Sequence, residues 1–277
     1  MCDLSIVLVP GAFGLPEFYA PQVPHFPPPN LTPNFLRIAH AVASHGHSIQ
    51  VLSLPTIPHY NSTLGTPPPM SADAAYIARI VSQLADEDKD ILLISHSYGG
   101  VPMSESVKGL SKKERKKKGK KGGIVRLAYL TSIVPEVGKS VTDTFAGVPV
   151  GQQLGLGVDE LGWLYQANVT RNAAIVFSDL PSTEAVAWAE RFYRQSAVSY
   201  AGPLTYAGYA DVPVSYLVCE RDLVIPATLQ RGMIAMIERV AGRKVDVESI
   251  DTGHVPVASQ PDLVVDWILR VVKKASR

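Results

Sequence analysis

Cysteine is almost absent from this chain, with only Cys2 and Cys219 among 277 residues. Because Cys219 stands inside an apolar, strand-like run, we expect no framework of disulfides, and the composition fits a reducing compartment. No apolar run approaches the roughly 18 residues that a membrane-spanning helix requires. The N-terminal "SIVLVPGAFG" is typical of a first core strand and its loop, not of a cleaved leader. These observations predict a cytoplasmic protein.

Excess charge and metal-ligand patterns are also missing. The formal net charge is +1 at pH 7, which favours neither nucleic acid nor a membrane as a partner of the whole molecule. Four histidines show no spacing with cysteines or acids that would suit a metal, namely His40, His45, His47 and His59. We therefore expect no metal and no cofactor, and the sequence leaves both a monomer and a homodimer open.

What the sequence does contain is a regular alternation of short apolar runs with helical patterns. This alternation predicts an α/β fold with a mostly parallel central sheet and helices on both faces. The expected strands are Ser5–Val9, Ser48–Leu54, Asp90–Ile94, Val125–Thr131, Val214–Cys219 and Lys244–Ile250. The expected helices are Phe35–Ser44, Ala72–Ala85, Tyr98–Lys108, Ala227–Ala241 and a last one that Pro261 opens.

Three stretches interrupt this alternation. Residues 135–213 contain helical pieces such as Ser182–Gln195 but no strand that belongs to the sheet. We expect them to form a cap over the substrate, inserted into a core of residues 1–134 and 214–277. The proline-rich Pro21–Phe35 predicts a loop. The basic run Ser111–Lys121, "SKKERKKKGKK", carries a net charge of about +7 and predicts a solvated, catalytically idle linker.

A candidate nucleophile follows the third strand, in "ILLISHSYGG". A serine exposed at the end of a strand needs a tight turn into the next helix, and this turn crowds the backbone two residues before and two after it. Around Ser97 these places carry the small residues Ser95 and Gly99. Plain structural turns use the same residues, and a serine hydroxyl alone is a poor nucleophile, so the hypothesis requires a base elsewhere.

An acid and a base follow two later strands. "VSYLVCERDLVIP" places Asp222 just beyond one strand, and "VESIDTGHVPV" places His254 just beyond the next. Because parallel strands end at the same edge of a sheet, we expect Ser97, Asp222 and His254 to lie together as nucleophile, orienting acid and base.

Neighbouring side chains are less well placed for these roles. Glu220 stands too close to its strand, Asp211 precedes that strand, and Asp251 would face away from His254 in the same loop. His96 precedes Ser97 on a strand, where side chains alternate. We therefore expect its ring to point away from Ser97 and to pack or bond under the turn.

The loop after the first strand supplies candidate donors for an oxyanion. In "VLVPGAFG", Gly11 lets the backbone bend so that the N–H of Ala12, with that of Phe13 as a further candidate, points at the space above Ser97. The second donor would be the N–H of Tyr98 at the start of the following helix. In isolation, this glycine loop would be interpreted as a simple turn.

These motifs resemble the α/β-hydrolases of the small-cap group that includes plant methylesterases and hydroxynitrile lyases, and still more their fungal and bacterial AB-hydrolase-1 type relatives. The resemblance covers nearly the whole chain, with "VLVPGAF", "HSYGG", "YLVCERDLVIPATLQRGMI" and "DTGHVPVASQPD" each in place. It implies the α/β-hydrolase fold, no cofactor, Ser97 as nucleophile, His254 as base and Asp222 as orienting acid.

The chain also departs from that group. Pro10 replaces the common histidine before the oxyanion glycine, which leaves the backbone donors available. The lyases that the chain resembles use a lysine after the catalytic histidine and a threonine in the oxyanion loop, whereas this chain has Val255 and Gly11 there. The resemblance therefore argues against cyanohydrin cleavage.

The expected substrate is a small apolar molecule, because the cap is rich in apolar side chains and has no cluster of Arg or Lys for a phosphate or coenzyme A. These cap side chains are Phe145, Leu154, Leu161, Trp163, Leu164, Tyr165, Phe177, Trp188, Phe192 and Tyr193. We predict a serine esterase that cleaves a carboxylic ester or lactone through an acyl-enzyme. Two alternatives stay open: C–C bond cleavage or condensation on a polyketide-like secondary metabolite, and a weakly catalytic ligand sensor.

Overall fold

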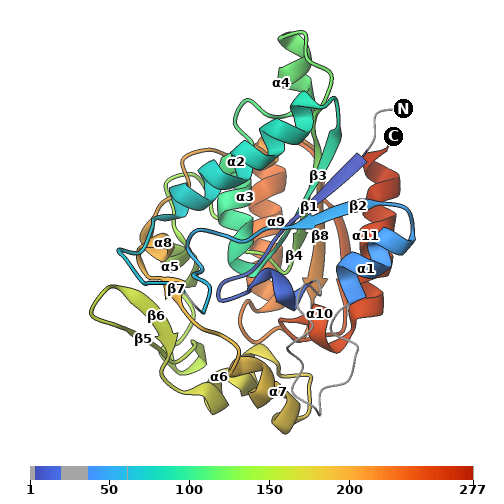
Figure 1. The fold of residues 1–277 in the computed structure, drawn as a ribbon. Coiled ribbons are helices and arrows are strands. Elements are labelled where there is room, and N and C mark those ends of the chain that lie inside the picture. The colour runs from blue at the N-terminus through green and yellow to red at the C-terminus, as the bar shows by residue number, and fades with distance from the viewer. Residues whose placement is uncertain (1–3, 20–36, 61, 277) are drawn as a thin grey trace.

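A computed structural model describes residues 4–19, 37–60 and 62–276 of the chain (Figure 1). Its main sheet has six strands, all parallel to their neighbours, in the order β2-β1-β3-β4-β8-β9. These strands are β1 (Leu4–Val9), β2 (Ser48–Val51), β3 (Asp90–His96), β4 (Gly123–Leu130), β8 (Val214–Cys219) and β9 (Asp246–Ile250). The predicted parallel sheet is confirmed, with each strand within a few residues of its expected bounds.

Burial along each strand follows its place in the sheet. All six residues of β8 are buried, as are all but the first residue of β3. The edge strands β2 and β9 instead alternate between more and less exposed residues. Continuous apolar runs therefore form the centre, where helices cover both faces, and alternating runs form the rims.

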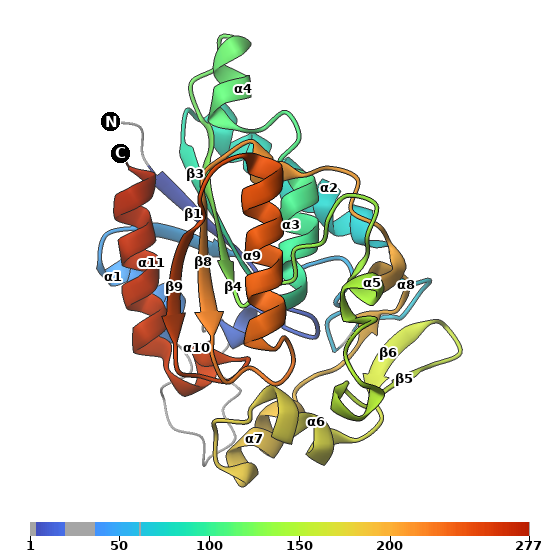
Figure 2. The same cartoon turned by 180° about the vertical axis from the view of Figure 1, so that it is seen from behind.

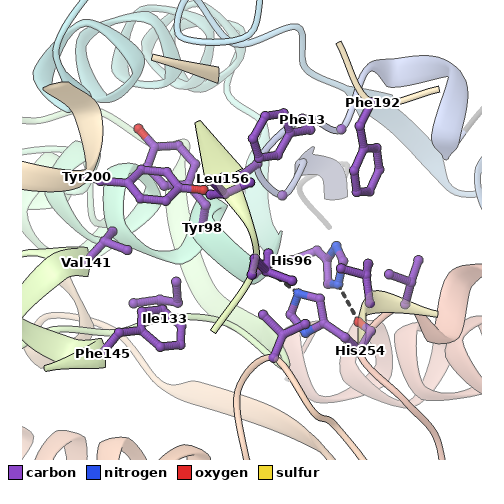
Figure 3. Close-up of a pocket in the computed structure, with 18 of the residues that line it drawn as sticks. Phe13, His96, Tyr98, Ile133, Val141, Phe145, Leu156, Phe192, Tyr200 and His254 are labelled. Carbon is purple, nitrogen blue, oxygen red and sulfur yellow. Dashed lines mark hydrogen bonds between the residues drawn. The ribbon is translucent and has the colours of Figure 1, made fainter. Parts of the chain in front are cut away.

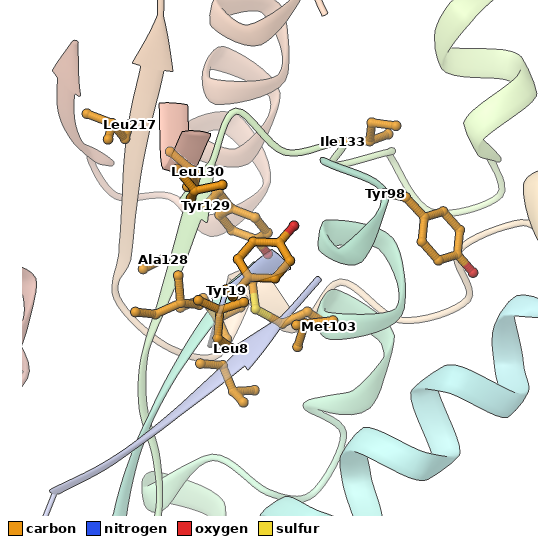
Figure 4. Close-up of a cluster of buried hydrophobic side chains, with 14 of the residues drawn as sticks. Leu8, Tyr19, Tyr98, Met103, Ala128, Tyr129, Leu130, Ile133 and Leu217 are labelled. Atoms are coloured by element: carbon orange, nitrogen blue, oxygen red, sulfur yellow. The ribbon is translucent and has the colours of Figure 1, made fainter. Parts of the chain in front are cut away.

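Helices cover both faces of the sheet (Figures 1 and 2). On one face α1 (Arg37–Ser44) packs beside α11 (Pro261–Ala275), and the other face carries α2 (Met70–Asp86), α3 (Gly100–Ser106) and α9 (Ala227–Ala241). The short α10 (Pro256–Ser259) precedes α11. The core between these layers includes Leu8, Met103 and Tyr129 (Figure 4). No helix in the described ranges combines the length and apolarity needed to cross a membrane.

Residues 141–201 lie over the carboxyl ends of the main strands, whereas the turn at Gly208–Ala210 packs against α3 and α9 (Figure 1). They contain α5 (Val141–Phe145), α6 (Val169–Val176), α7 (Ser182–Ala189), α8 (Val198–Ala201), and a separate antiparallel sheet of β5 (Leu156–Val158), β6 (Trp163–Gln166) and β7 (Gln195–Ser196). The helix expected over Ser182–Gln195 ends at Ala189, and Gln195 belongs to β7 instead. Short 3-10 turns are η1 (Pro16–Phe18), η3 (Ser97–Gly99), η4 (Val150–Gln152) and η5 (Gly208–Ala210).

The basic run connects α3 to β4 and its lysines are mostly exposed, as predicted, but part of it is helical and one of its basic residues is buried. Its first half forms the helix α4 (Lys112–Lys117). Ser111 caps this helix, and its hydroxyl accepts the N–H of Glu114. Arg115 is buried: its Nε donates to the carbonyl of Gly122 at 2.7 Å and its guanidinium meets Asp86 at 2.7 Å. Figure 1 shows α4 at the opposite end of the molecule from the cap. The other interruption, Pro21–Phe35, lies outside the described residues.

Arg115→Ala should lower the free energy of unfolding by about 2 kcal/mol, because the buried carbonyl of Gly122 loses its donor. The adjacent Lys116 is exposed, so Lys116→Ala should change stability by less than about 0.5 kcal/mol. Urea unfolding of the two variants measures this difference. Equal stability of both would mean that Arg115 is as idle as its neighbours.

Candidate active site

Ser97 lies in a tight turn between β3 and α3. Its φ is +51°, a backbone conformation that side chains other than glycine rarely adopt and that is found at strained functional turns. A Cβ on Gly99 would lie 2.4 Å from the carbonyl oxygen of Pro10, so only glycine fits there. Ser95, two residues before Ser97, is fully buried against Ser132. The crowding expected on both sides of Ser97 is present.

Ser97, His254 and Asp222 form one hydrogen-bonded row. The Oγ atom of Ser97 lies 2.9 Å from Nε2 of His254, and Nδ1 of His254 lies 2.7 Å from Oδ2 of Asp222. A carboxylate oxygen accepts, so Nδ1 carries the proton and the lone pair of Nε2 faces the hydroxyl of Ser97. All three side chains are buried. The structure thus brings together three residues that stand after β3, β8 and β9.

The carboxylate of Asp222 is held by further donors that the sequence patterns did not reveal. Its Oδ1 accepts the N–H groups of Val224 at 2.7 Å and Ile225 at 2.8 Å, and its Oδ2 accepts the hydroxyl of Thr131. Gln230 holds the same loop, because its amide donates to the carbonyl of Ile225 at 2.7 Å. These contacts fix the plane of the carboxylate toward His254.

The acids that compete with Asp222 in the sequence have other partners. Glu220 pairs with Arg231 at 2.6 Å, and Asp251 pairs with Arg221 at 2.8 Å. Asp211 accepts the hydroxyl of Tyr206 at 2.6 Å. Asp222 is therefore the carboxylate that contacts His254.

The loop after β1 lies directly above Ser97, since a Cβ on Gly11 would lie 3.0 Å from the Cβ of Ser97. Within the described residues, the N–H groups of Ala12 and Tyr98 have no hydrogen-bond acceptor. Both residues line the cavity over Ser97. The N–H of Phe13 donates instead to Oε1 of Gln195 in the cap, at 3.4 Å. Of the three expected oxyanion donors, Phe13 is therefore already engaged.

A cavity of about 370 Å³ opens over Ser97 between the core and the cap (Figure 3). Its walls are mostly apolar, with aromatic side chains from Phe13, Phe145, Phe177 and Phe192. No lysine, arginine, aspartate or glutamate is among its described lining residues. Of the apolar cap residues singled out in the sequence, Phe145, Leu154, Phe177 and Phe192 line it.

His96 lies nearer the site than the strand alternation predicts. Its ring lines the same cavity as Ser97, and its centroid is 5.0 Å from that of His254. Both ring nitrogens of His96 are hydrogen-bonded, which agrees with the predicted bonded ring. The prediction that the ring points away from the site is wrong. No group of three or more His, Cys, Asp or Glu side chains suited to a metal occurs in the described part of the chain.

Asp73, in the first turn of α2, is a further buried residue that sequence analysis missed. It is fully buried and accepts the hydroxyl of Tyr98 at 2.8 Å and the hydroxyl of Thr56 at 2.6 Å. Burial raises the pKa of Asp73 from its ordinary 3.8 to about 6, although these donors act in the opposite direction. Asp73 thereby holds the side chain of Tyr98, the residue after Ser97, against the helix α2.

Comparison with known proteins supports the architecture. The sequence profile of the alpha/beta hydrolase family matches residues 6–267. The chain belongs to this family. It is 31% identical over 266 residues to the probable hydrolase R7 of a Phoma species, covering 95% of this chain and 96% of that protein. It is 26% identical over 280 residues to the alpha/beta hydrolase nvfD of Aspergillus novofumigatus, covering 99% of each.

Solved structures of this hydrolase fold are also similar. A pyrethroid hydrolase from Sphingobium faniae matches with a TM-score of 0.70 and 21% identity over 97% of each chain. Polyneuridine aldehyde esterase matches with a TM-score of 0.68 and 16% identity, covering 98% of this chain and 100% of the other. A tomato methylketone synthase I variant, complexed with beta-ketoheptanoate, has a TM-score of 0.68 and 18% identity, covering 99% and 98%.

Asp73 should make stability depend on pH. Between about pH 4 and about pH 6 the folded chain keeps the proton of Asp73 while the unfolded chain has lost it, so its contribution to stability falls as pH rises. The two pKa values, 3.8 and about 6, differ by the equivalent of ~3 kcal/mol. Relative to Asp73→Asn, the wild type should lose most of this, about 2 kcal/mol, between about pH 4 and about pH 7 in urea unfolding.

Asp86→Asn is the control for this pH series. Hydrogen bonds from Lys120 and Arg115 lower the pKa of Asp86 to about 2, so Asp86 titrates below the tested range in the folded chain. The difference in stability between wild type and Asp86→Asn should therefore stay nearly constant across the series. If the difference between wild type and Asp73→Asn stayed constant across the series, Asp73 would not be a proton-binding group of the folded chain.

Proposed function

We propose that this hydrolase is a serine esterase that cleaves a carboxylic ester or lactone of a small, uncharged and largely apolar molecule. The observation that carries the proposal is the row of hydrogen bonds from Ser97 through His254 to Asp222 at the floor of an apolar cavity. A serine hydroxyl becomes a competent nucleophile when a base of this kind stands beside it.

The catalytic cycle follows from these contacts. Nε2 of His254 takes the proton of Ser97 as Oγ attacks the carbonyl carbon, and Asp222 stabilises the imidazolium that forms. The N–H groups of Ala12 and Tyr98 donate to the oxyanion. The intermediate then expels the alcohol, which receives the proton from His254, and leaves an acyl group on Ser97. Water, deprotonated by His254, attacks this acyl group; the bond to Oγ of Ser97 then breaks, the acid is released, and His254 returns its proton to Oγ.

The cavity supports an uncharged substrate. Its described walls carry no cationic side chain, so a free carboxylate or phosphate would be desolvated without a partner, which costs several kcal/mol. The names of two fold relatives, a pyrethroid hydrolase and polyneuridine aldehyde esterase, fit a hydrolase and an esterase activity. The same walls disfavour a free β-keto acid of the kind bound to the methylketone synthase variant. Val255, which lines the cavity after His254, likewise brings no charge.

A fluorophosphonate should label Ser97 stoichiometrically, and Ser97→Ala should lose about 10⁴-fold or more of kcat on short p-nitrophenyl esters. Ser106→Ala, which removes a buried hydroxyl from the helix α3 that follows Ser97, is the matched control and should stay within about twofold. Peptide mapping locates the label. Labelling at a different serine contradicts the proposal, and a labelled Ser97 without ester turnover would favour the ligand sensor.

Asp222→Asn should leave the fold intact, because an amide oxygen still accepts the N–H groups of Val224 and Ile225. It should lower kcat by about 10⁴-fold, since the amide selects the wrong tautomer of His254 and cannot stabilise its imidazolium. Glu220→Gln, two residues away, should stay within about threefold. Steady-state kinetics with circular dichroism tests this pair, and greater damage from Glu220→Gln would reassign the acid.

A further inference from the structure

Two buried side chains outside the row of Ser97, His254 and Asp222 connect the loop after β1 to the loop after β9. The N–H of Gly11 donates to the hydroxyl oxygen of Tyr19 at 3.1 Å. That hydroxyl lies 2.8 Å from Nδ1 of His96, and Nε2 of His96 lies 2.8 Å from the carbonyl oxygen of His254 (Figure 3). Tyr19 and His96 are 3% and 5% exposed, so both side chains are largely shielded from bulk water.

The direction of every proton in this chain of bonds follows from its ends. A carbonyl oxygen only accepts, so Nε2 of His96 must carry a hydrogen and donate it to His254. Burial lowers the pKa of His96 to about 3, which keeps the ring neutral and leaves Nδ1 as an acceptor. Tyr19, whose pKa burial raises, therefore donates its O–H to Nδ1 and accepts the N–H of Gly11 on the same oxygen.

One end of this chain of bonds holds Gly11, whose carbonyl shares a peptide plane with the Ala12 N–H. The N–H of Gly11 is held by Tyr19, and the carbonyl of Gly11 accepts the N–H of Gly14 at 3.0 Å. In a planar trans peptide the carbonyl of Gly11 and the N–H of Ala12 point in opposite directions. Fixing Gly11 at both of its polar groups therefore fixes the direction of the Ala12 N–H.

The other end holds the backbone of His254. Its carbonyl accepts from His96, while its ring contacts Ser97 and Asp222. The same two side chains thus set the distance between an oxyanion donor and the base. An error of about 1 Å between such groups costs about 10²-fold in rate.

We propose that Tyr19 and His96 are positioning residues, which hold the Ala12 N–H and the His254 ring in register with Ser97. This inference rests on the proposed serine esterase function. It assigns to His96 a donor role toward His254 and no proton transfer to or from the substrate. Tyr19 acts only through Gly11 and His96.

The tautomer of His96 can be measured without a substrate. In the full chain with ¹⁵N-labelled histidine, His96→Gln identifies the His96 signals by their loss. We expect Nδ1 to show the shift of an unprotonated nitrogen and Nε2 that of an N–H, unchanged between about pH 5 and about pH 9. Protonation at Nδ1, or titration within this range, would overturn the proposal.

Kinetics on a p-nitrophenyl ester tests the positioning role. Tyr19→Phe should lower kcat by about 10- to 100-fold and leave KM within about threefold, because an oxyanion donor acts in the transition state. His96→Leu should have a similar effect, and His96→Gln, whose amide can still donate to the His254 carbonyl, should recover at least about threefold of that loss. The double variant Tyr19→Phe/His96→Leu should be no worse than the more damaging single variant within about threefold, since both break one chain of bonds.

Tyr129→Phe is the matched control, because Tyr129 is also buried and bonded, to Ser104, away from the cavity. It should keep kcat within about twofold. The positioning role would be overturned by any of three results. Tyr19→Phe could change KM alone, it could have no more effect than Tyr129→Phe, or its effect on kcat could add to that of His96→Leu. If Ser97→Ala is inactive while Tyr19→Phe keeps full kcat, only this inference fails. If Ser97→Ala keeps its activity, the proposed function fails, and the tautomer measurement still tests the bonds of His96.

Discussion

The close approach of the turn after β3 to the end of β1 is the constraint on which the site depends. A Cβ on Gly99 would lie 2.4 Å from the carbonyl of Pro10 and 2.8 Å from that of Val9, so the two backbones touch. The same turn is bent sharply, and Ser97 has its positive φ there. It also places the loop at Gly11 directly over Ser97. Neither feature survives if the two strands separate.

The parallel direction of the strands brings the other residues of the site to Ser97. Since β3, β8 and β9 run in the same direction, their carboxyl ends deliver Ser97, Asp222 and His254 to one edge. The polar groups at that edge are buried and form hydrogen bonds with one another. Examples are the N–H groups that donate to Asp222 and the two hydrogen bonds of the His96 ring. The cap then supplies apolar walls and no charge in the described lining. Hydrogen-bonded polar residues therefore lie at the base of a cavity with apolar walls, an arrangement that fits a neutral carbonyl compound.

Much of this arrangement could be predicted from the sequence because it depends on local patterns. Apolar runs located the six strands, and small residues around Ser97 located the turn. The capping pair Ser111 and Glu114 was also a local signal, but the positive charge of the run obscured it, and the helix α4 was missed.

Other contacts could not be predicted, since they join residues far apart in the sequence. Asp73 meets Tyr98 and Thr56 only after α2 packs on α3. Strand alternation placed the ring of His96 away from Ser97, whereas its bonds to Tyr19 and His254 hold it in the cavity lining. The small cap sheet also escaped prediction, because β7 has only two residues.

The central claim is that Ser97 carries the acyl group during turnover. Rapid quenching of the wild type with two esters that share an acyl group but differ in alcohol, followed by mass spectrometry, tests it most directly. The account predicts one and the same added mass with both esters, located on the peptide that contains Ser97. Ester turnover with an added mass on another residue, or with adducts that retain the alcohol, would contradict it.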